Sequence, residues 1–435
     1  MEKIVSLAKR RGFIFPGSEI YGGLAGTFDY GPHGVLLKEN VERLWLSMFR
    51  DNRDDMYGVD AAILMNSKVW EASGHVAGFS DPLVECGKCK KRFRADHLDD
   101  QVECPECKGI LGDTRQFNMM FKTHAGATED DSAVVYLRPE TAGGMFVNFK
   151  NVVDSLHPKL PFGIAQIGKA FRNEIAPRDF VFRLRELSQM EVEYFVRPAD
   201  WERSFEEWRE IMHRFAEAIG LPQESLHELE VPAEDRAHYS KRTIDFEFDY
   251  PFGRKELWGL AYRTNFDLSA HAKASSAELS YLDEETKEKI VPHVIEPSLG
   301  VDRTILAILS SAYREDELGG EARTYLALDP KIAPVKAMVS PLLKNKPELV
   351  AKAREIRAEL KKVHPSIAWD DNGNIGKRYR RQDEIGTPFC VTIDFDTLEE
   401  NGELKDTVTL RHRDTGEQER LTISEVVERI RTAIQ

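Results

Sequence analysis

Four cysteines form two pairs whose spacing suits a metal ion. Two residues separate Cys86 from Cys89 and Cys104 from Cys107, and residues 90–103 lie between the pairs. Two such pairs can fold back on each other and place four thiolates tetrahedrally around Zn²⁺. Four protein ligands leave no coordination position for water, so the sequence predicts a structural zinc site. The alternative, two disulfides or four unrelated thiols, is disfavoured in the reducing interior of a cell.

Positive charge is concentrated in the segment 169–185, although the chain carries a formal net charge of -14. The segment holds five Lys or Arg residues and two acidic ones. The planar guanidinium of arginine can bind phosphate oxygens at two points and stays charged at ordinary pH. We therefore expect a hairpin here that contacts a phosphate group through arginines such as Arg172.

A second candidate phosphate contact lies where an apolar helix is expected to begin. The sequence Glu296-Pro-Ser-Leu-Gly-Val-Asp-Arg303 runs into the apolar stretch 305–309. Gly300 permits close approach of the backbone, and Arg303 would project from the first helical turn toward an anion. An ordinary helix start is the alternative interpretation of this short motif.

Two carboxylates on one predicted strand point in the same direction. In the strand expected over 190–196, Glu191 and Glu193 share one face, and Val192 and Tyr194 share the other. Two acidic side chains aimed the same way require an explanation.

The remaining pattern predicts the elements that position these residues. Apolar residues at helical spacing predict helices beginning at Gly34 and covering 200–219, and strand-like alternation appears at 163–167. From Tyr325 the predicted order is strand 335–339, a helix with apolar residues from 349 to 360, strands 389–395 and 407–410, and a last helix opened by the capping box Thr422-x-x-Glu425. The chain is therefore expected to end in a compact α/β domain.

Length and composition predict several folded units. The chain has 435 residues, of which 41% are hydrophobic, 60 are Lys or Arg and 74 are Asp or Glu. No uncharged apolar stretch reaches the roughly 18 residues that span a bilayer, so we predict a soluble, cytoplasmic protein with no membrane partner. The net negative charge argues against nonspecific nucleic-acid binding, and any phosphate ligand must meet local positive clusters.

The order of the motifs resembles that of class II aminoacyl-tRNA synthetases: an interface helix, an arginine-bearing antiparallel hairpin and a G-x-D-R helix start. Within that class, the chain is similar to the glycyl-tRNA synthetases of the homodimeric type from Gly12 to the C-terminus. The matching phrases are Glu19-Ile-Tyr-Gly-Gly23, Asp29-Tyr-Gly-Pro32, Ala72-Ser-Gly-His75, Arg94-Ala-Asp-His97, Leu137-Arg-Pro-Glu-Thr-Ala142, Phe171-Arg-Asn-Glu174 and Pro292-His-Val-Ile-Glu-Pro-Ser298.

The resemblance implies an α+β fold. An antiparallel sheet flanked by helices would form the catalytic core, with a zinc-ribbon insert and a C-terminal α/β anticodon-binding domain of the class IIa type. The implied segments are catalytic core with motif 1 (1–85), zinc-ribbon-like insert (86–112), core with motif 2 (113–198), small helical insert (199–245), core with motif 3 (246–322) and anticodon-binding domain (323–435).

The resemblance also implies an enzyme, a glycine–tRNA ligase. It would activate glycine with ATP to glycyl-adenylate and pass glycine to the 3′ end of tRNA(Gly), releasing AMP and pyrophosphate. The implied cofactors are ATP and Mg²⁺ for catalysis and Zn²⁺ for structure. The implied partners are glycine, ATP, tRNA(Gly) and a second copy of the chain in a homodimer.

Family roles carried onto matching positions give three sets of residues. The catalytic set is Arg172, Glu174 and Arg303. The ATP set is Arg172, Asn173, Glu174, Phe182, Arg183, Leu187, Glu256, Leu257, Gly300 and Arg303. The glycine set is Arg94, Glu140, Leu187, Glu191, Glu296, Ser298 and Gly300. In the family the equivalents of Glu140, Glu191 and Ser298 hold the substrate ammonium, which would account for the orientation of Glu191.

Contacts with tRNA are expected in two basic clusters. They are Lys90, Lys91 and Arg92 between the cysteine pairs, and Lys377, Arg378, Arg380 and Arg381 in the C-terminal domain. Cations beside an aromatic residue suit phosphate contact and base stacking, and a solvated charged face is the alternative. Because the segment 198–245 is short compared with that of many relatives, we expect tRNA specificity to depend on these clusters.

Two other functions fit parts of the pattern. A synthetase-like protein without catalysis would be expected to lack the arginines found here at 172 and 303. A class II synthetase for serine, alanine or proline is the nearer alternative, and the combination of Glu140, Glu191 and Ser298 favours glycine.

Overall fold

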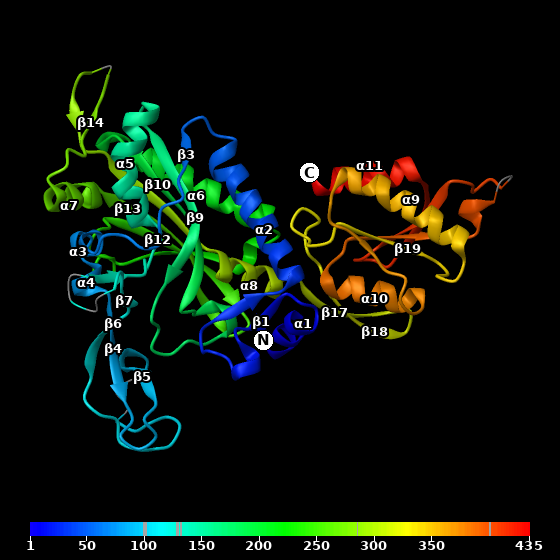
Figure 1. Ribbon diagram of the computed structural model, residues 1–435, viewed down its shortest axis with the longest axis horizontal. Helices are drawn as coiled ribbons and strands as arrows, with labels where there is room; N and C mark the ends of the chain where they lie inside the picture. Colours follow the sequence, from blue (N-terminus) through cyan, green and yellow to red (C-terminus); the bar gives the residue numbers. More distant parts are fainter. Residues whose placement is uncertain (99–101, 128–129, 131–132, 285, 400–401) are drawn as a thin grey trace.

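A seven-stranded sheet is the centre of the protein (Figure 1). The computed structural model describes residues 1–98, 102–127, 130, 133–284, 286–399 and 402–435. The strand order is β11 (Leu226–Glu230), β12 (Arg242–Tyr250), β13 (Gly253–Thr264), β16 (His293–Gly300), β10 (Glu186–Val196), β9 (Phe162–Phe171) and β3 (Met56–Gly58). Every neighbouring pair is antiparallel except β3 and β9. The predicted antiparallel sheet is therefore confirmed.

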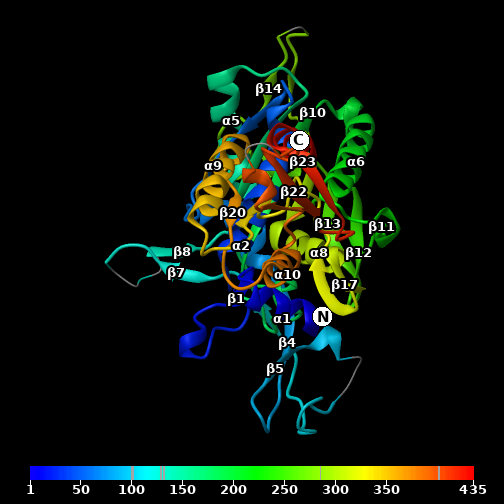
Figure 2. The same cartoon turned by 90° about the vertical axis from the view of Figure 1, so that its right-hand side faces the viewer.

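Helices cover both faces of this sheet (Figures 1 and 2). α5 (Ala142–Leu156) and α7 (Phe266–Ser275) pack on the face that carries Phe195, where Phe146 and Phe149 contact its ring. α2 (Pro32–Leu46), α6 (Trp201–Ala218) and α8 (Val301–Ala312) bury their apolar residues in the core that contains Val192. The alternation along β10 thus separates two cores, as the two-residue period of a strand requires.

The segment 199–245, predicted as a small helical insert, packs on the central sheet and extends it. The apolar stripe of α6, with Trp208, Met212 and Phe215, is buried in the larger hydrophobic cluster. The residues after α6 supply β11 and the start of β12, which extend the central sheet. A helix with so wide an apolar stripe needs a large partner surface, and the sheet provides one.

An extension leaves the core between β3 and α5, at the lower left of Figure 1. Its order is α3 (Lys68–Ala72), α4 (His75–Gly78), the sheet of β4 (Ser80–Glu85), β5 (Arg92–Arg94) and β6 (Arg115–Asn118), and the hairpin of β7 (Lys122–His124) and β8 (Val134–Tyr136). The cysteine pairs lie in loops of this extension. Elsewhere, α1 (Glu2–Arg10), β1 (Ile14–Pro16) and β2 (Phe28–Tyr30) precede α2, and β14 (Tyr281–Leu282) pairs with β15 (Lys289–Ile290).

The C-terminal part has its own sheet and core. Its strand order is β20 (Ile367–Trp369), β19 (Ala337–Pro341), β21 (Phe389–Ile393), β22 (Thr407–His412) and β23 (Gln418–Thr422). α9 (Pro347–Val363) and α11 (Ile423–Ile434) pack together on one face, and α10 (Ile375–Ile385) lies on the other (Figure 1). The predicted capping box is present, because the Thr422 hydroxyl accepts from the Glu425 N–H and the Glu425 carboxylate accepts from the Thr422 N–H.

A buried carboxylate joins this C-terminal part to the preceding hairpin of β17 (Tyr313–Leu318) and β18 (Glu321–Leu326). Asp383 of α10 is fully buried and accepts two hydrogen bonds from Arg411 of β22, at 2.8 and 2.9 Å. Arg323 of β18 lies 3.6 Å from the same carboxylate and donates to the carbonyl of Arg413. We call these three residues, Asp383, Arg411 and Arg323, the Asp383 cluster.

Among the described residues, no helix has the length and hydropathy needed to cross a bilayer.

Candidate active site

A cavity of about 350 Å³ opens over β10, β13 and β16. Its walls are completed by the loop before α5, the segment between β9 and β10, and the first turn of α8. The predicted glycine and ATP residues that line it are Glu140, Arg172, Glu174, Phe182, Arg183, Leu187, Glu191, Glu256, Leu257, Glu296, Ser298, Gly300 and Arg303. Segments far apart in the sequence therefore bring one acidic and one basic group of side chains into a single space.

Glu191 is held from two sides. On the neighbouring strand Ser298 lies directly opposite it, and the Ser298 hydroxyl donates to Glu191 Oε1 at 2.6 Å. The Thr141 hydroxyl, just before α5, donates to Oε2. Two donors fix the plane of the carboxylate, which is 2% exposed. Glu191 is thus oriented to receive a cation from the cavity.

Glu140 stands beside Glu191 as a second buried carboxylate. His75 Nε2 lies 3.4 Å from its Oε2, and Ser73 Oγ lies 2.8 Å from His75 Nδ1. Burial alone would raise the pKa of Glu140, but the charges of His75, Arg263 and Arg172 outweigh it and lower that pKa to about 2. Glu140 is therefore ionised at neutral pH.

The basic side of the cavity begins at the end of β9. Arg172 donates from Nε to the Pro139 carbonyl at 3.1 Å, and its guanidinium lies 5.6 Å from the Phe79 ring centroid. Glu174 is 9% exposed, and its Oε2 makes no hydrogen bond to any described residue. The nearest cation to that oxygen is Arg183, at 3.8 Å. An acceptor without a donor on a cavity wall is available to a ligand.

Arg303 closes the opposite end of the cavity. Its guanidinium lies 4.4 Å from the Phe182 ring centroid and pairs with Glu256 Oε2 at 3.0 Å. Asp245 lies on the same wall, where burial and the charges of Glu256 and Glu247 raise the pKa of Asp245 to about 7. This end therefore combines an aromatic surface, a fixed cation and two carboxylates.

Two of the predicted substrate residues are not on the cavity wall. Arg94 of β5 donates to Asp81 at 2.6 Å and to Asp96 at 2.7 Å. Its guanidinium is therefore bound within the extension. Asn173 uses its backbone N–H to donate to the Met119 carbonyl at 2.7 Å. The glycine contact of Arg94 and the ATP contact of Asn173 therefore stay predictions.

Comparison with known proteins agrees with these features. Residues 121–312 match the family described as "tRNA synthetase class II core domain (G, H, P, S and T)", and residues 336–433 match "Anticodon binding domain". A Clostridium tetani protein named glycine–tRNA ligase is 49% identical, with 100% of this chain and 98% of the relative covered. The chain belongs to the glycine–tRNA ligase family.

Other relatives of the same name show similar agreement. The Treponema denticola protein is 49% identical over 100% of this chain and 97% of its own length. The Alkaliphilus oremlandii protein is 50% identical over 98% of this chain and 96% of its own length. As a member of the glycine–tRNA ligase family, the chain is a class II aminoacyl-tRNA synthetase, and its segment 121–312 contains both Arg172 and Arg303.

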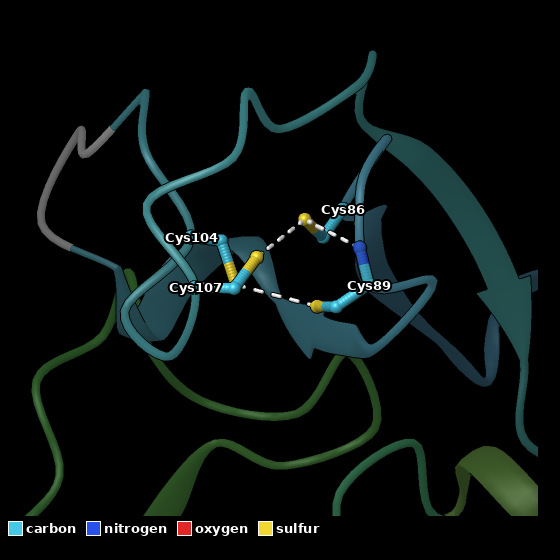
Figure 3. Close-up of side chains that lie close together, drawn as sticks. All are labelled: Cys86, Cys89, Cys104 and Cys107. Atoms are coloured by element: carbon cyan, nitrogen blue, oxygen red, sulfur yellow. Dashed lines mark hydrogen bonds between the residues drawn. The ribbon is translucent and has the colours of Figure 1, made fainter.

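The cysteine pairs of this family member come together in the extension (Figure 3). Cys86 Sγ and Cys107 Sγ are 3.5 Å apart, and Cys89 Sγ and Cys104 Sγ are 3.7 Å apart. The S–S bond of a disulfide is about 2.05 Å long, so these four cysteines are free thiols. Ligands at the usual zinc–sulfur distance of about 2.3 Å lie about 3.8 Å apart in a tetrahedron. The four residues fit one zinc ion.

The two basic clusters predicted for tRNA differ in exposure. Lys90, Lys91 and Arg92 are all exposed on the extension. Arg378 is 2% exposed and donates to the Ser340 hydroxyl and to backbone carbonyls, including that of Pro341. The prediction that Arg378 contacts tRNA does not fit this position, because its guanidinium holds the start of α10 in place. The residues of that cluster that line an open groove are Lys377, Arg380 and Arg381.

The sequence analysis missed a buried arginine in this family member. Arg263 of β13 is 1% exposed, donates to both oxygens of Asp267 at 2.9 and 2.8 Å, and donates to Glu296 at 2.6 Å. The i, i+4 spacing of Arg263 and Asp267 was a signal, but β13 ends between them and hides the helical pattern. Glu296 lines the cavity, and the cation paired with it, Arg263, lies behind the cavity wall.

Proposed function

We propose that this chain activates glycine with ATP and transfers it to tRNA(Gly). The glycine carboxylate attacks the α-phosphorus of ATP and pyrophosphate leaves; the ribose hydroxyl at the 3′ end of tRNA then attacks the adenylate carbonyl and AMP leaves. The observation that carries the proposal is that one cavity holds two buried carboxylates, Glu140 and Glu191, together with Arg172. Glu140 is ionised, whereas burial and the charge of Glu140 raise the pKa of Glu191, so a bound ammonium would favour the charged form of Glu191. Carboxylates can bind the ammonium group of an amino acid, and an arginine can bind the phosphate to which its carboxylate becomes joined.

The acidic set suits an amino acid without a side chain. Glycine can be selected only through its ammonium and carboxylate groups and by exclusion of bulk. Glu140, Glu191 and the Ser298 hydroxyl offer oxygen acceptors for an ammonium, and the Thr141 and Ser298 donors prevent Glu191 from turning away. A larger amino acid would have to displace these bonded groups, which costs more than a missing methylene contact of about 1 to 3 kcal/mol.

The basic end suits ATP. Arg172 would neutralise charge that develops on the α-phosphate, and this reaction depends mainly on positioning and charge stabilisation. Glu174 Oε2, which has no hydrogen-bond donor among the described residues, would accept a hydrogen bond from the exocyclic amine of adenine. Arg303 lies over the Phe182 ring, 4.4 Å from its centroid, so the two side chains form one cationic and aromatic surface on which a base would stack.

Asp245 and Glu256 are the carboxylates that fit Mg²⁺ beside the phosphates. Both line the cavity, and burial together with the charge of Glu256 raises the pKa of Asp245 to about 7. Hard oxygen ligands of this kind hold Mg²⁺ together with substrate phosphates. When bound there, the ion would supply charge neutralisation on the phosphate oxygens.

The test of the proposed function is exchange of labelled pyrophosphate into ATP, measured without tRNA. We expect exchange with glycine and none with alanine, serine or proline. Exchange with another of these amino acids would assign a different substrate. No exchange with any of them, with or without tRNA, would mean that the chain does not catalyse activation.

The four cysteines are expected to hold one structural zinc ion. Metal analysis should find one zinc per chain, and Cys104→Ser should lose it and make the extension sensitive to protease, because the metal would hold the two loops together beyond backbone hydrogen bonds such as that from Gly87 to Ile110. Glycine-dependent pyrophosphate exchange should change little, since none of the four cysteines lines the cavity. Freshly purified protein with four titratable thiols and no zinc would contradict the assignment.

Lys90, Lys91 and Arg92 are expected to contact tRNA. Replacing all three by alanine should raise the Michaelis constant for tRNA about tenfold and flatten its salt dependence, because phosphate contacts release counterions. Glycine-dependent pyrophosphate exchange should be unchanged. The matched control is Lys361→Ala with Lys362→Ala, which removes exposed charge from the end of α9. Equal tRNA kinetics in the two variants would overturn the assignment.

The groove beside α10 is a second candidate tRNA surface. It is lined by Lys377, Arg380 and Arg381 together with Arg11, so cations from both ends of the chain face it. Tyr379 provides an aromatic ring on the same wall. Such a surface can contact phosphates and stack on unpaired bases.

A homodimer would cover an apolar loop near α2. Ile20, Tyr21 and Leu24 are 89%, 88% and 59% exposed, which is unusual for three large apolar residues in one short loop. A second copy related by a two-fold axis is the occupant expected for this class of synthetase. Sedimentation at micromolar concentration should give a dimer, and a monomer would contradict this assignment.

A further inference from the structure

Glu193 is a carboxylate that the proposed reaction does not use. It follows Glu191 on the same face of β10, but it does not line the cavity and is fully buried. Neither of its oxygens has a hydrogen-bond partner among the described residues. An ionised carboxylate in such a place would lose its hydration without gaining a donor, which costs several kcal/mol.

The register of the sheet makes an ionised Glu193 still less favourable. Glu191 pairs with Ser298 and Tyr194 with Ile295, so Glu193 falls directly opposite Glu296 on the same face. One carboxylate oxygen from each of Glu191, Glu193 and Glu296 lies within 4.8 Å of the others. Like charges placed directly opposite each other on neighbouring strands repel.

The nearby cation cannot neutralise Glu193 as well. Arg263 uses its guanidinium for both oxygens of Asp267 on α7 and for Glu296 Oε1 on β16. The charged groups that face Glu193 are therefore Glu296, Arg263, Glu191 and Asp267, of which three are negative. Burial and the charge of Glu296 raise the pKa of Glu193 well above its usual range.

We propose that Glu193 is a positioning residue, held as a neutral carboxylic acid that keeps its proton, directs its O–H toward the Glu296 oxygen within 4.8 Å of it, and so supports the Glu296–Arg263 pair beside the glycine pocket. The inference rests on the proposed function, because it assigns a role to the wall of that pocket. A neutral Glu193 leaves Arg263 bound to Glu296 and Asp267. It also leaves Glu140 and Glu191 as the carboxylates that meet the substrate ammonium, whose positive charge favours the ionised form of Glu191.

Two variants, Glu193→Gln and Glu193→Leu, distinguish a neutral hydrogen-bond donor at position 193 from an ionised carboxylate. Glu193→Gln keeps the shape and a donor but cannot ionise, so the Michaelis constant for glycine in pyrophosphate exchange should stay within about threefold of wild type. Glu193→Leu removes the donor at similar volume and should raise that constant about ten- to a hundredfold, with a smaller effect on kcat. Thermal unfolding of both variants shows whether they remain folded.

Glu191→Gln is the matched control, with the same substitution on the same face of the same strand. Because Glu191 must be charged to bind an ammonium, this variant should raise the Michaelis constant for glycine at least about thirtyfold. A Glu193→Gln variant that loses as much as Glu191→Gln would overturn the inference. If wild type itself gave no glycine-dependent exchange, the proposed function would fail instead.

Infrared spectroscopy measures the proton directly. The difference spectrum between wild type and Glu193→Gln at neutral pH should contain the carbonyl absorption of a protonated carboxylic acid. A difference spectrum with only carboxylate bands would show that Glu193 is ionised and would overturn the inference. Binding of Mn²⁺ to wild type that is lost in Glu193→Gln would do the same, since three ionised carboxylates would then hold a cation.

Discussion

Replacing Arg172 by alanine is expected to lower kcat for glycine-dependent pyrophosphate exchange about 10²- to 10³-fold. The Arg172 guanidinium is held in advance by the Pro139 carbonyl and by the Phe79 ring. A charge that is positioned before the reaction needs no rearrangement as negative charge grows on the α-phosphate. The effect should therefore appear mainly in kcat, with a smaller change in the Michaelis constant for glycine.

Arg178→Ala is the matched control for Arg172→Ala. Arg178 belongs to the same segment between β9 and β10, but its side chain is 51% exposed and pairs with Asp179 at 3.5 Å. Its removal should leave exchange without tRNA near the wild-type rate. Equal losses in both variants would mean that the segment acts through its total charge, and the specific role of Arg172 would be wrong.

Replacing Asp383 by asparagine is expected to lower the free energy of unfolding of the C-terminal part by about 3 to 5 kcal/mol. Arg411 is 3% exposed and would keep a buried positive charge without its carboxylate, whereas Arg323 would retain its pair with Asp316. The loss of stability should lower the temperature at which the C-terminal part unfolds. Aminoacylation of tRNA should fall with it, whereas pyrophosphate exchange without tRNA should persist, because the cavity lies on the central sheet.

Asp396→Asn is the control for this second substitution. Asp396 lies in the same C-terminal part but is exposed, so removing its charge should change stability by less than about 0.5 kcal/mol. An unchanged thermal transition in Asp383→Asn would contradict the importance of the Asp383 cluster. A parallel loss of pyrophosphate exchange would show that the two parts of the chain do not unfold separately.

The sequence alone predicted the elements whose patterns are local. The helix now seen as α2, the strands β9 and β10, and the capping box of α11 follow from apolar periodicity and from end signals. The same periodicity revealed that Glu191 shares a strand face with Glu193. Its partner Ser298 could be placed only by resemblance, since β16 lies more than a hundred residues further along the chain.

Other roles could not be judged from the sequence, because they depend on contacts that only the fold supplies. Arg378 and Arg381 belong to one basic run, yet only the packing of α10 decides that Arg378 is buried. Arg94 matches a family phrase, but Asp81 and Asp96 occupy its guanidinium. α10 itself was missed, because its sequence is dominated by charged residues and its apolar positions are few. For Arg378, packing against another segment overrode the local signal.

The direct pairing of Glu191 with Ser298 also limits how such a gene can change in length. Inserting or deleting one codon within β10 or β16 would turn every following side chain to the opposite face of the sheet. The acidic residues would then enter the apolar core around Val192, and the frame of the pocket would be lost even if the chain stayed compact. Length variation between related genes should therefore be confined to connections such as the cysteine-bearing extension and the β14–β15 hairpin, which lie outside the seven-stranded sheet.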